Sequence, residues 1–447
     1  MTKRQRSRAA LALVAAGVLT LSACTQVTPD DGSSGDADSV SDGTITTGAG
    51  ITEEACPDGV NADNGCIYLG VLSDLTEGPF AALAVPITDA QRAFWAQVNA
   101  DGGIGGYDID IDTYTRDTKY QAAEHAAQYQ QIAAGVLGIA QSLGTVNTEA
   151  VLPDMVERSL VTVPTSWWSG YAFEENDSGI ILETGYSYCT EALVGLDWFA
   201  EENGSPATVQ AVGYPGDYGG DSAEGVNRWA EVNGATALDP IGTGPNQVVG
   251  NQDAVVAAVL DGGADVVVLA VGPAETAEIV GKLAASGFSG RFLGALPTWN
   301  PALLESAAAP ALEALYNHLT PYENWDGSSA SIEAAKASLN GELPANGGYI
   351  IGWGIGYPMK AALETAADAG DLTPEGLASV IDGLTVDFDG LMQPHTYGGD
   401  PQSNANQAVN VGVPDPDVEL GLRTIASFYE GTSFDETDYS AACVASS

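Results

Sequence analysis

The sequence predicts an α/β protein with two similar lobes, each built like a Rossmann unit around a parallel sheet. From about residue 67 to residue 382, short apolar runs typical of buried strands alternate with longer amphipathic segments typical of helices. Such alternation is typical of βαβ units and parallel sheets. The pattern restarts near residue 187, and Phe94–Asn99 (FWAQVN) resembles Arg228–Asn233 (RWAEVN). We therefore expect two similar lobes, the alternative being a chance likeness of two amphipathic helices.

The first half of the chain supplies four predicted strands. Ile67–Leu72 is a continuous apolar run, and Ile109–Thr115 alternates isoleucine with polar residues, as in a strand with one covered face. Between them, the helix Pro86–Asn99 is expected to end at the glycines 102 and 103. The other elements follow in order: helix 121–134, strand 136–140, helix 148–158 and strand 160–163.

The second half repeats the alternation and then returns to helices. The expected elements are helix 187–202, strand 208–213, helix 221–233, helix 252–260, strand 265–271, helix 274–285, strand 292–294, helix 348–367 and helix 374–382. Because the last two helices need a sheet to cover, we expect the chain to cross between the lobes more than once. The expected boundaries are 56–185 plus 323–384 for lobe 1, and 186–322 plus 385–447 for lobe 2.

The first 24 residues predict where the protein works. Four basic residues precede residue 9, and an apolar run of about 13 residues follows. This pattern predicts a secretory signal over residues 1–23, and the apolar run within it is too short to span a hydrocarbon core of ~30 Å. Leu-Ser-Ala-Cys at 21–24 resembles a bacterial lipobox, which implies a lipid on Cys24, whereas a chance cysteine after an ordinary signal is the alternative. Residues 24–55 are expected to be a solvated tether that holds the body on the outer side of the cell membrane.

Charge and cysteine content limit the partners. The chain has 14 basic and 60 acidic residues, a formal charge of −46, which argues against nucleic-acid binding and against a polybasic membrane contact. Without Cys24, four cysteines remain, and an even number outside the cell favours disulfides over free buried thiols. Of the three possible pairings we favour Cys56–Cys66, a short loop, and Cys189–Cys443, which would fix the C-terminal tail.

Residue patterns typical of catalysis are missing from the sequence. His125, His318 and His395 are far apart, and there is no Gly-x-Ser-x-Gly, no P-loop and no Cys-x-x-Cys. We therefore expect no enzyme activity, no metal and no cofactor, and an extracellular hydrolase is the weakest hypothesis. The pairs Asp387/Asp389 and Asp415/Asp417 lie outside any twelve-residue calcium loop and are expected to form a solvated surface. Gly213–Gly220 follows a strand and is expected to be a ligand-contacting loop rather than a dinucleotide site.

Aromatic residues after strands indicate a binding pocket. Trp167 and Trp168 follow the strand 160–163, and two consecutive side chains cannot both face one core. At least one tryptophan is therefore expected to face a cleft, unless one is core and the other partly exposed. Phe80, Tyr218 and Trp299 occupy equivalent loops, which predicts a largely apolar pocket with a few polar groups.

An ordered series of motifs over residues 66–430 resembles one family. The series contains 67–72 followed by Gly78-Pro79, then VNADGGIGG at 98–106, Asp117-Thr118, Asp217-Tyr218-Gly219 and Ala285-Ser286-Gly287. The second motif is similar to the family pattern Ile/Val-Asn-x-x-Gly-Gly-Ile-x-Gly. On these motifs the chain resembles the ABC-transporter solute-binding lipoproteins of the branched-chain amino-acid-binding, leucine-binding-protein-like kind, which have the type I periplasmic binding protein fold.

The resemblance implies two lobes joined by a hinge, with a ligand held between them. Its carboxylate would be bound by two loops of lobe 1, here Gly144–Asn147 and Thr165–Trp167, with Tyr218 as the aromatic residue of lobe 2. Relatives that bind amino acids hold the ammonium with an acidic residue, but the matching stretch 294–299 has none, so we expect an amide or an aromatic or aliphatic acid. The candidate ligand-binding residues are Phe80, Thr145, Val146, Asn147, Thr165, Ser166, Trp167, Trp168, Tyr218, Gly272, Thr298 and Trp299.

The function that the resemblance implies is capture of a small ligand by a monomeric, lipid-anchored receptor. Closure of the lobes over an amino-acid-like ligand, or a related amide or carboxylic acid, would precede docking on an ABC permease. The alternative is a ligand-sensing lipoprotein that acts on a protein partner rather than in transport.

Overall fold

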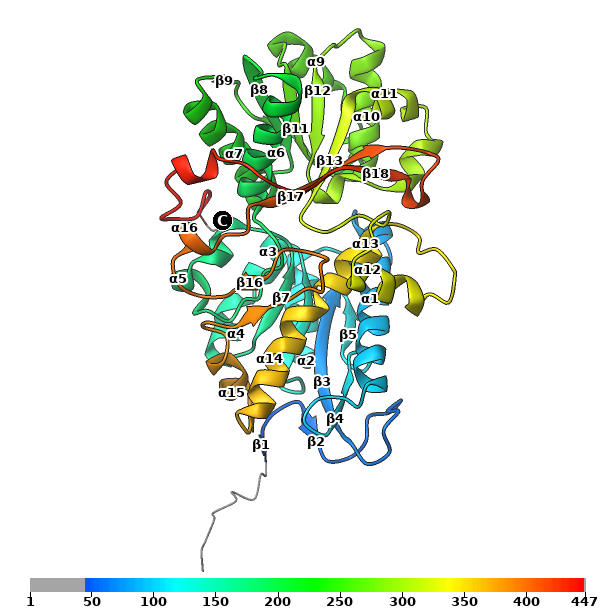
Figure 1. Cartoon of the computed structure of the whole chain (residues 1–447), viewed down its shortest axis with the longest axis vertical. Coiled ribbons are helices and arrows are strands. Elements are labelled where there is room, and N and C mark those ends of the chain that lie inside the picture. The colour runs from blue at the N-terminus through cyan, green and yellow to red at the C-terminus, as the bar shows by residue number, and fades with distance from the viewer. Residues whose placement is uncertain (1–44, 446–447) are drawn as a thin grey trace, which may run out of the picture. The chain divides into compact units, whose positions relative to one another are not determined.

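The structure, a computed structural model, describes residues 45–445 (Figure 1). The expected signal segment, Cys24 and most of the expected tether lie outside the described residues. Over the described range, no helix is both long enough and apolar enough to cross a membrane. Two parallel-rich sheets with helices against them form the body, which confirms the predicted α/β fold with two lobes.

The first sheet has six strands and is built around β3 (Gly65–Ser73). This apolar strand is almost wholly buried, and it pairs in parallel with β4, β5 and β6. β6 continues in parallel to β7, whereas β2 pairs with β3 antiparallel. The bounds of the other strands are β2 Ile51–Thr52, β4 Tyr107–Asp110, β5 Thr115–Asp117, β6 Gly138–Leu143 and β7 Thr162–Thr165. The helices between them are α1 Ala81–Ala100, α2 Ala122–Ile132, α3 Thr145–Glu149, α4 Leu152–Glu157 and α5 Glu174–Asp177.

The second sheet has eight strands in the order β10-β8-β11-β12-β13-β17-β18, with β9 beside β8. It is parallel as far as β13 and antiparallel through β17 and β18, the strands drawn in orange to red in Figure 1. The strands are β8 Thr208–Gly213, β9 Thr236–Ala237, β10 Ile241–Gly242, β11 Val266–Ala270, β12 Arg291–Gly294, β13 Tyr316–Thr320, β17 Ala408–Pro414 and β18 Leu422–Glu430. Its helices are α6 Tyr188–Asn203, α7 Asp217–Asn233, α8 Asn246–Val249, α9 Asp253–Gly262, α10 Pro273–Ala285 and α11 Ala309–Leu315.

After β13 the chain returns to the first sheet before it forms β17. Gln91 Nε2 of α1 donates to the carbonyl of Gly352 in α13 over 2.6 Å, and Phe94 packs edge-on against Trp353. The chain thus passes between the two sheets three times, in keeping with the expectation of more than one crossing. The returning elements are α12 Ala330–Ser338, α13 Gly348–Gly354, α14 Gly356–Asp368, β14 Asp371–Leu372, α15 Pro374–Ser379, β15 Thr385–Val386, β16 His395–Thr396 and α16 Pro401–Asn404.

Regular structure begins ten residues earlier than expected. The predicted start was Cys56, but β1 (Thr46–Thr47) pairs with β14, and β2 pairs with β3. Ile45 and Ile51 pack against the core. These two apolar side chains in a polar stretch are therefore the physical reason for the earlier start.

Three predicted elements are broken in the structure. The strand 109–115 becomes β4 and β5, the helix 148–158 becomes α3 and α4, and the helix 348–367 becomes α13 and α14. Pro153 lies at the first turn of α4, where its missing N–H costs nothing. Glycines at 352, 354 and 356 weaken the long helix where it divides.

Helix α1, by contrast, is longer than predicted, because it begins at Ala81, five residues before the expected start at Pro86. A proline inside a helix leaves the carbonyl four residues earlier without its usual donor. Here that carbonyl belongs to Ala82, and it accepts from Asn346 Nδ2 over 2.7 Å. A side chain from the returning segment therefore compensates for the proline, which no local pattern of α1 indicates.

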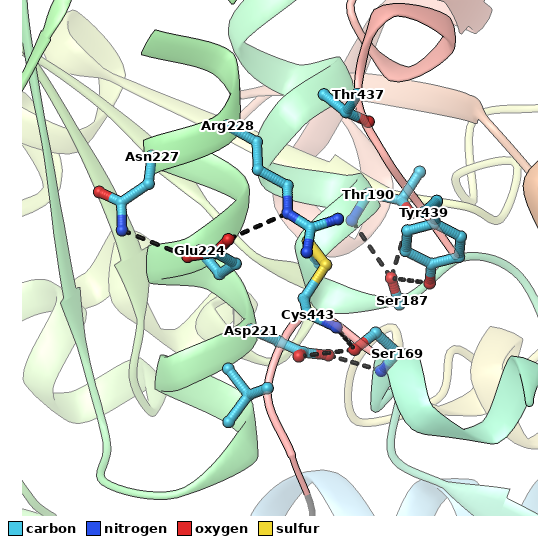
Figure 2. The surroundings of a disulfide bond; sticks show 12 residues. Ser169, Ser187, Thr190, Asp221, Glu224, Asn227, Arg228, Thr437, Tyr439 and Cys443 are labelled. Carbon is cyan, nitrogen blue, oxygen red and sulfur yellow. Dashed lines mark hydrogen bonds and ion pairs between the residues drawn. A yellow bond between two sulfur atoms is a disulfide. The ribbon is translucent and has the colours of Figure 1, made fainter. Parts of the chain in front are cut away.

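Both predicted disulfides are confirmed. Cys56 pairs with Cys66 at the start of β3, and Cys189 of α6 pairs with Cys443 near the C-terminus. Figure 2 shows the second bond with its neighbours: the Cys443 N–H donates to Ser169 Oγ over 2.8 Å. Trp168 Nε1 donates to the carbonyl of Val444 over 2.9 Å. The C-terminal tail is thereby attached both to α6 and to the segment that follows β7.

Candidate functional site

A cavity of about 530 Å³ lies between loops of the two sheets. Its first wall comes from the segments that follow β6 and β7, together with the start of α1 and residues 119–122. Its second wall comes from the segment that joins β8 to α7, from α8 and from Pro297. Because parallel strands present their carboxyl ends at one edge of each sheet, the ligand-contacting loops of an α/β protein gather in such a place.

The loop after β6 is shaped by a glycine and by its own hydrogen bonds. Gly144 has a φ of +91°, and a Cβ there would come within 2.6 Å of the Tyr120 ring. Asn147 Nδ2 donates back to the carbonyl of Leu143 over 3.0 Å, and Thr148 Oγ1 donates to the carbonyl of Gly144 over 2.9 Å. The loop is therefore held in one conformation beside the cavity.

Two buried oxygens in the cavity wall have no hydrogen-bond partner among the described residues. They are Thr165 Oγ1, at the end of β7, and Asp217 Oδ2, at the start of α7. Burial raises the pKa of Asp217 by more than a hydrogen bond with Thr145 lowers it. Buried polar groups are almost always paired, so these two unpaired atoms on opposite walls have bonding capacity available to a molecule in the cavity. Together they offer a hydroxyl and a carboxylate.

A series of aromatic rings forms the apolar part of the cavity. Trp167 and Tyr188 have ring centres 5.9 Å apart, and Tyr188 and Tyr218 are 4.5 Å apart. Phe80 approaches Tyr214 from the other wall at 6.3 Å. Trp167 Nε1 donates to the carbonyl of Thr184, and Tyr218 Oη donates to the carbonyl of Val271 over 3.1 Å. The rings are thus fixed and offer their faces or edges to an apolar group.

The rim of the cavity combines an ion pair with exposed apolar side chains. Lys119 Nζ lies 2.5 Å from Glu77 Oε1. Val146 and Val248, from the two walls, are 46% and 79% exposed. Exposed valines on both sides of an opening provide apolar surface that is available for contact when a ligand enters.

Eight of the twelve candidate residues line this cavity. They are Phe80, Thr145, Val146, Asn147, Thr165, Ser166, Trp167 and Tyr218. The expectation that one of two consecutive tryptophans faces a cleft agrees with the placement of Trp167. Trp168 instead packs on Tyr171 and bonds to the C-terminal tail.

The other three candidates lie outside the cavity lining. Trp299 stacks on Tyr316 and donates to the carbonyl of Leu420, and Thr298 Oγ1 lies 2.6 Å from Tyr316 Oη. The physical reason is a short 3₁₀ helix at Leu296–Thr298, which presents Pro297 to the cavity. Gly272 lies behind the wall, where its N–H donates to Tyr214 Oη over 3.0 Å.

Several lining residues were not among the twelve candidates, although two of them belong to the expected ligand-contacting loop 213–220: Tyr120, Tyr188, Tyr214, Asp217, Pro297 and Ile351. Asp217 had a detectable signal, because it precedes Tyr218 in a recognised motif, but the helix was expected to begin at residue 221. The helix begins at Asp217, which places this carboxylate in its first turn. Ile351 comes from α13, far along the chain, and no local pattern indicates it.

Metal ligation finds no support within residues 45–445, where no group of three His, Cys, Asp or Glu side chains is placed to hold an ion. Among the acidic pairs considered above, Asp415 forms an ion pair with Arg423 at 2.8 Å, and Asp389 accepts from Tyr357 Oη.

Comparison with known proteins identifies the architecture. A sequence profile of the family described as periplasmic binding protein matches residues 67–415. The fatty acid ABC transporter substrate-binding protein of Thermomonospora curvata superposes with a TM-score of 0.78 at 24% identity, covering 88% of this chain and 97% of that one. No match was found among curated proteins.

Two further solved structures show the same fold with ligands present. A branched chain amino acid ABC transporter protein from Thermus thermophilus with bound valine gives a TM-score of 0.72 at 17% identity, covering 83% of this chain and 98% of that one. A solute-binding protein from R. palustris in complex with 4-hydroxybenzoate gives 0.67 at 16% identity, covering 82% and 98%.

Proposed function

The chain belongs to the periplasmic binding protein family of ABC-transporter solute-binding proteins, and from that premise we propose that it captures an amino-acid-like ligand or a related amide. The ligand would lie between the two lobes and would be delivered to an ABC permease. Contacts to both walls of the 530 Å³ cavity would stabilise the closed arrangement of the lobes.

The observation that carries this proposal is the pair of unpartnered oxygens on opposite walls. Thr165 Oγ1 has a proton to donate to a ligand carbonyl or carboxylate, and Asp217 Oδ2 has a lone pair to accept from a ligand N–H. A ligand with both groups would satisfy both walls at once. The aromatic rings between them favour an apolar side chain on that ligand.

Asp217 changes the expected ligand class. The lack of an acidic residue in 294–299 favoured a ligand without an ammonium group. However, α7 brings a carboxylate to the cavity from another segment. A buried carboxylate without a cation is costly, so a ligand nitrogen that donates to Asp217 would offset that cost. We therefore favour amino acids and amides over simple acids.

A thermal-shift screen with matched sets tests the ligand class. Each set contains an apolar amino acid, its amide and the deaminated acid, for example phenylalanine, 3-phenylpropionamide and 3-phenylpropionate, or the leucine equivalents. A ligand at a hundred times its Kd adds about 2.7 kcal/mol to the free energy of unfolding, which is a shift of several degrees. We expect nitrogen-bearing members to give the larger shift, and Asp217→Asn to remove that preference.

Two results would contradict the proposal. If no member of any set shifts the melting temperature, the cavity does not serve this ligand class. If the deaminated acids bind best and Asp217→Asn has no effect, the carboxylate is not the partner of a ligand nitrogen.

We also propose that a lipid on Cys24 ties the protein to the outer face of the cell membrane. The support is the Leu-Ser-Ala-Cys sequence behind a basic and apolar signal segment. Cys24→Ser is expected to abolish incorporation of a labelled fatty acid and to move the protein from the membrane to the soluble fraction. Membrane retention of the serine variant would contradict lipid anchoring at this position.

A further inference from the structure

A second cavity, of about 310 Å³, lies where the chain passes from the first sheet into α6. Its wall contains Asp177 at the end of α5, Glu183 and the segment 185–187 that leads into α6. The opposite wall is formed by residues 395–406, which precede β17, with Tyr439 from the tail. None of its lining residues belongs to the first cavity.

This cavity contains carboxylate groups without a counter-charge. Asp177 is 1% exposed, and its Oδ1 accepts from the Gly179 N–H over 2.7 Å, whereas its Oδ2 has no partner. Glu183 Oε1 also lacks a partner, and no Lys or Arg is present among the lining residues that the structure describes. Burial raises the pKa of Asp177 to about 7 and the pKa of Glu183 well above its ordinary value, because a buried carboxylate without a cation is costly. A cation bound beside these groups would lower both pKa values and stabilise the ionised carboxylates.

The remaining polar groups do not supply the missing cation. Burial lowers the pKa of His395 to about 4, so its imidazole is neutral at pH 7. Asn406 accepts the Ala408 N–H at its Oδ1, but its Nδ2 donor is buried and unpartnered within residues 45–445. The cavity therefore offers two acceptors and one donor that the protein leaves unused, which calls for a ligand.

Four tyrosine rings complete the wall: Tyr171, Tyr186, Tyr397 and Tyr439. Tyr397 Oη donates to the carbonyl of Glu183 over 2.8 Å, and Tyr439 Oη lies 3.2 Å from Ser187 Oγ, as Figure 2 shows. Tyr186 Oη donates to Glu191 Oε1 over 3.2 Å. Because these hydroxyl groups are bound elsewhere, the rings are held in place. Fixed aromatic rings with unpaired carboxylates are the combination that recognises organic cations.

We propose that this cavity binds a compact organic ammonium ion. Its N–H groups donate to Asp177 and Glu183, its alkyl part lies against the tyrosine rings, and an oxygen on the ligand, where present, accepts from Asn406. A bare metal ion is the poorer occupant, because it would fill little of 310 Å³ and no three-ligand group is available in the described residues. The site is independent of the ligand proposed for the first cavity.

Calorimetric titration of the purified protein with n-butylammonium, and with n-butanol as a neutral probe of similar size, tests this site. We expect butylammonium to bind and butanol not to bind at the same concentrations. Asp177→Asn and Glu183→Gln keep the shape of each side chain and remove its charge. Each is expected to weaken butylammonium binding by about tenfold or more, the range for a hydrogen bond to a charged group.

Two further variants control for folding and for location. Glu175→Gln removes an exposed charge from the same helix α5, outside the cavity lining. This charge acts on Asp177 only through space, so the substitution is expected to change the affinity far less than Asp177→Asn. Thr396→Trp places a large side chain at an exposed position of the wall and is expected to block binding with both carboxylates intact. Melting temperatures of all variants establish that they fold.

Three results would overturn the proposal. The first is no binding of butylammonium, or binding no tighter than that of butanol. The second is an affinity that Asp177→Asn, Glu183→Gln and Thr396→Trp leave unchanged. The third is a loss of affinity in Asp217→Asn but not in Asp177→Asn, which would place the amine in the first cavity.

Discussion

The hydroxyl group of Thr165 is the side-chain atom whose role is most open to direct test. It is buried in the wall of the first cavity and has no partner among the described residues. Valine has the same shape without the hydroxyl, so Thr165→Val should leave the free energy of unfolding unchanged or raise it by up to about 1 kcal/mol. The same change should weaken ligand binding by roughly tenfold, because the ligand loses a donor.

Thr162 on the same strand is the matched control. Its hydroxyl donates to the carbonyl of Leu160 over 3.0 Å and does not line the cavity. Thr162→Val should therefore lower stability by about 1 kcal/mol and leave affinity unchanged. Calorimetry and denaturant unfolding measure both quantities. Equal affinity of Thr165→Val and the unaltered protein would remove Thr165 from the site.

Asp221 should give the protein a pH-dependent stability. Both its carboxylate oxygens accept from Ser169, and burial raises its pKa to about 8, more than these hydrogen bonds lower it. An unfolded aspartate has a pKa of about 3.9. Between these values the folded protein keeps a proton that the unfolded chain releases, so stability is lost as the pH rises from about 4 to about 8.

Melting temperatures from pH 5 to pH 8 test this behaviour. We expect the unaltered protein to lose stability over this range, and Asp221→Asn to lose less, because asparagine does not titrate. The slope removed by the substitution has an upper limit of about 1.4 kcal/mol per pH unit. Identical slopes for the two proteins would show that Asp221 is not protonated in the folded state.

At the scale of the elements, the disulfide between Cys189 and Cys443 attaches the tail to α6. It closes a separation of 254 residues, whereas Cys56–Cys66 closes one of 10. The chain-entropy relation assigns about 5 kcal/mol to the first bond and about 3 kcal/mol to the second. Replacing Cys189 and Cys443 by serine should therefore lower the free energy of unfolding more than replacing the other pair.

The tail also holds hydrogen bonds that depend on this bond. Arg228 Nη1 donates to the carbonyl of Asp438 over 2.7 Å, and Trp168 Nε1 donates to that of Val444. We expect limited proteolysis to cut near the C-terminus of the Cys189→Ser/Cys443→Ser variant and not of the Cys56→Ser/Cys66→Ser variant. Equal resistance of the two variants would show that packing alone holds the tail.

Most elements of the first three-quarters of the chain could be predicted, because each has its own local periodicity. The strand 208–213 and the helix 187–202 agree with β8 and α6 within a residue. The two strands β17 and β18 lie after helix 374–382, which was the last element expected from the sequence. Their antiparallel pairing depends on β13, which is far away in the sequence, and β18 alternates between exposed and partly buried residues.

The site was less predictable than the fold, because some of its residues are brought together only by contacts between distant segments of the chain. Trp167 follows a predicted strand, and that position predicted it, whereas Thr165 was expected only from the family resemblance. Tyr188 and Ile351 reach the cavity from helices, and nothing in their neighbourhoods distinguishes them from core residues. The difference between Trp167 and Trp168 depends on the C-terminal tail, which covers one and not the other.

At the scale of the whole molecule, capture of a ligand in the first cavity requires that the two lobes act together. Each wall of the first cavity offers only part of a binding site: Thr165 and Trp167 on one side, Asp217 and Tyr218 on the other. A ligand that contacts both walls binds more tightly when the two lobes are close together than when they are apart. This difference in affinity sets how far the ligand shifts the equilibrium toward the closed arrangement.

Small-angle scattering of the purified protein, with and without the ligand that gives the largest thermal shift, tests whether the ligand is captured between the lobes. We expect a smaller radius of gyration at saturating ligand, and we expect Thr165→Val to need about ten times as much ligand for the same decrease. Full saturation, verified by calorimetry, with an unchanged radius of gyration would show that the ligand does not bring the lobes together, and would contradict capture between them.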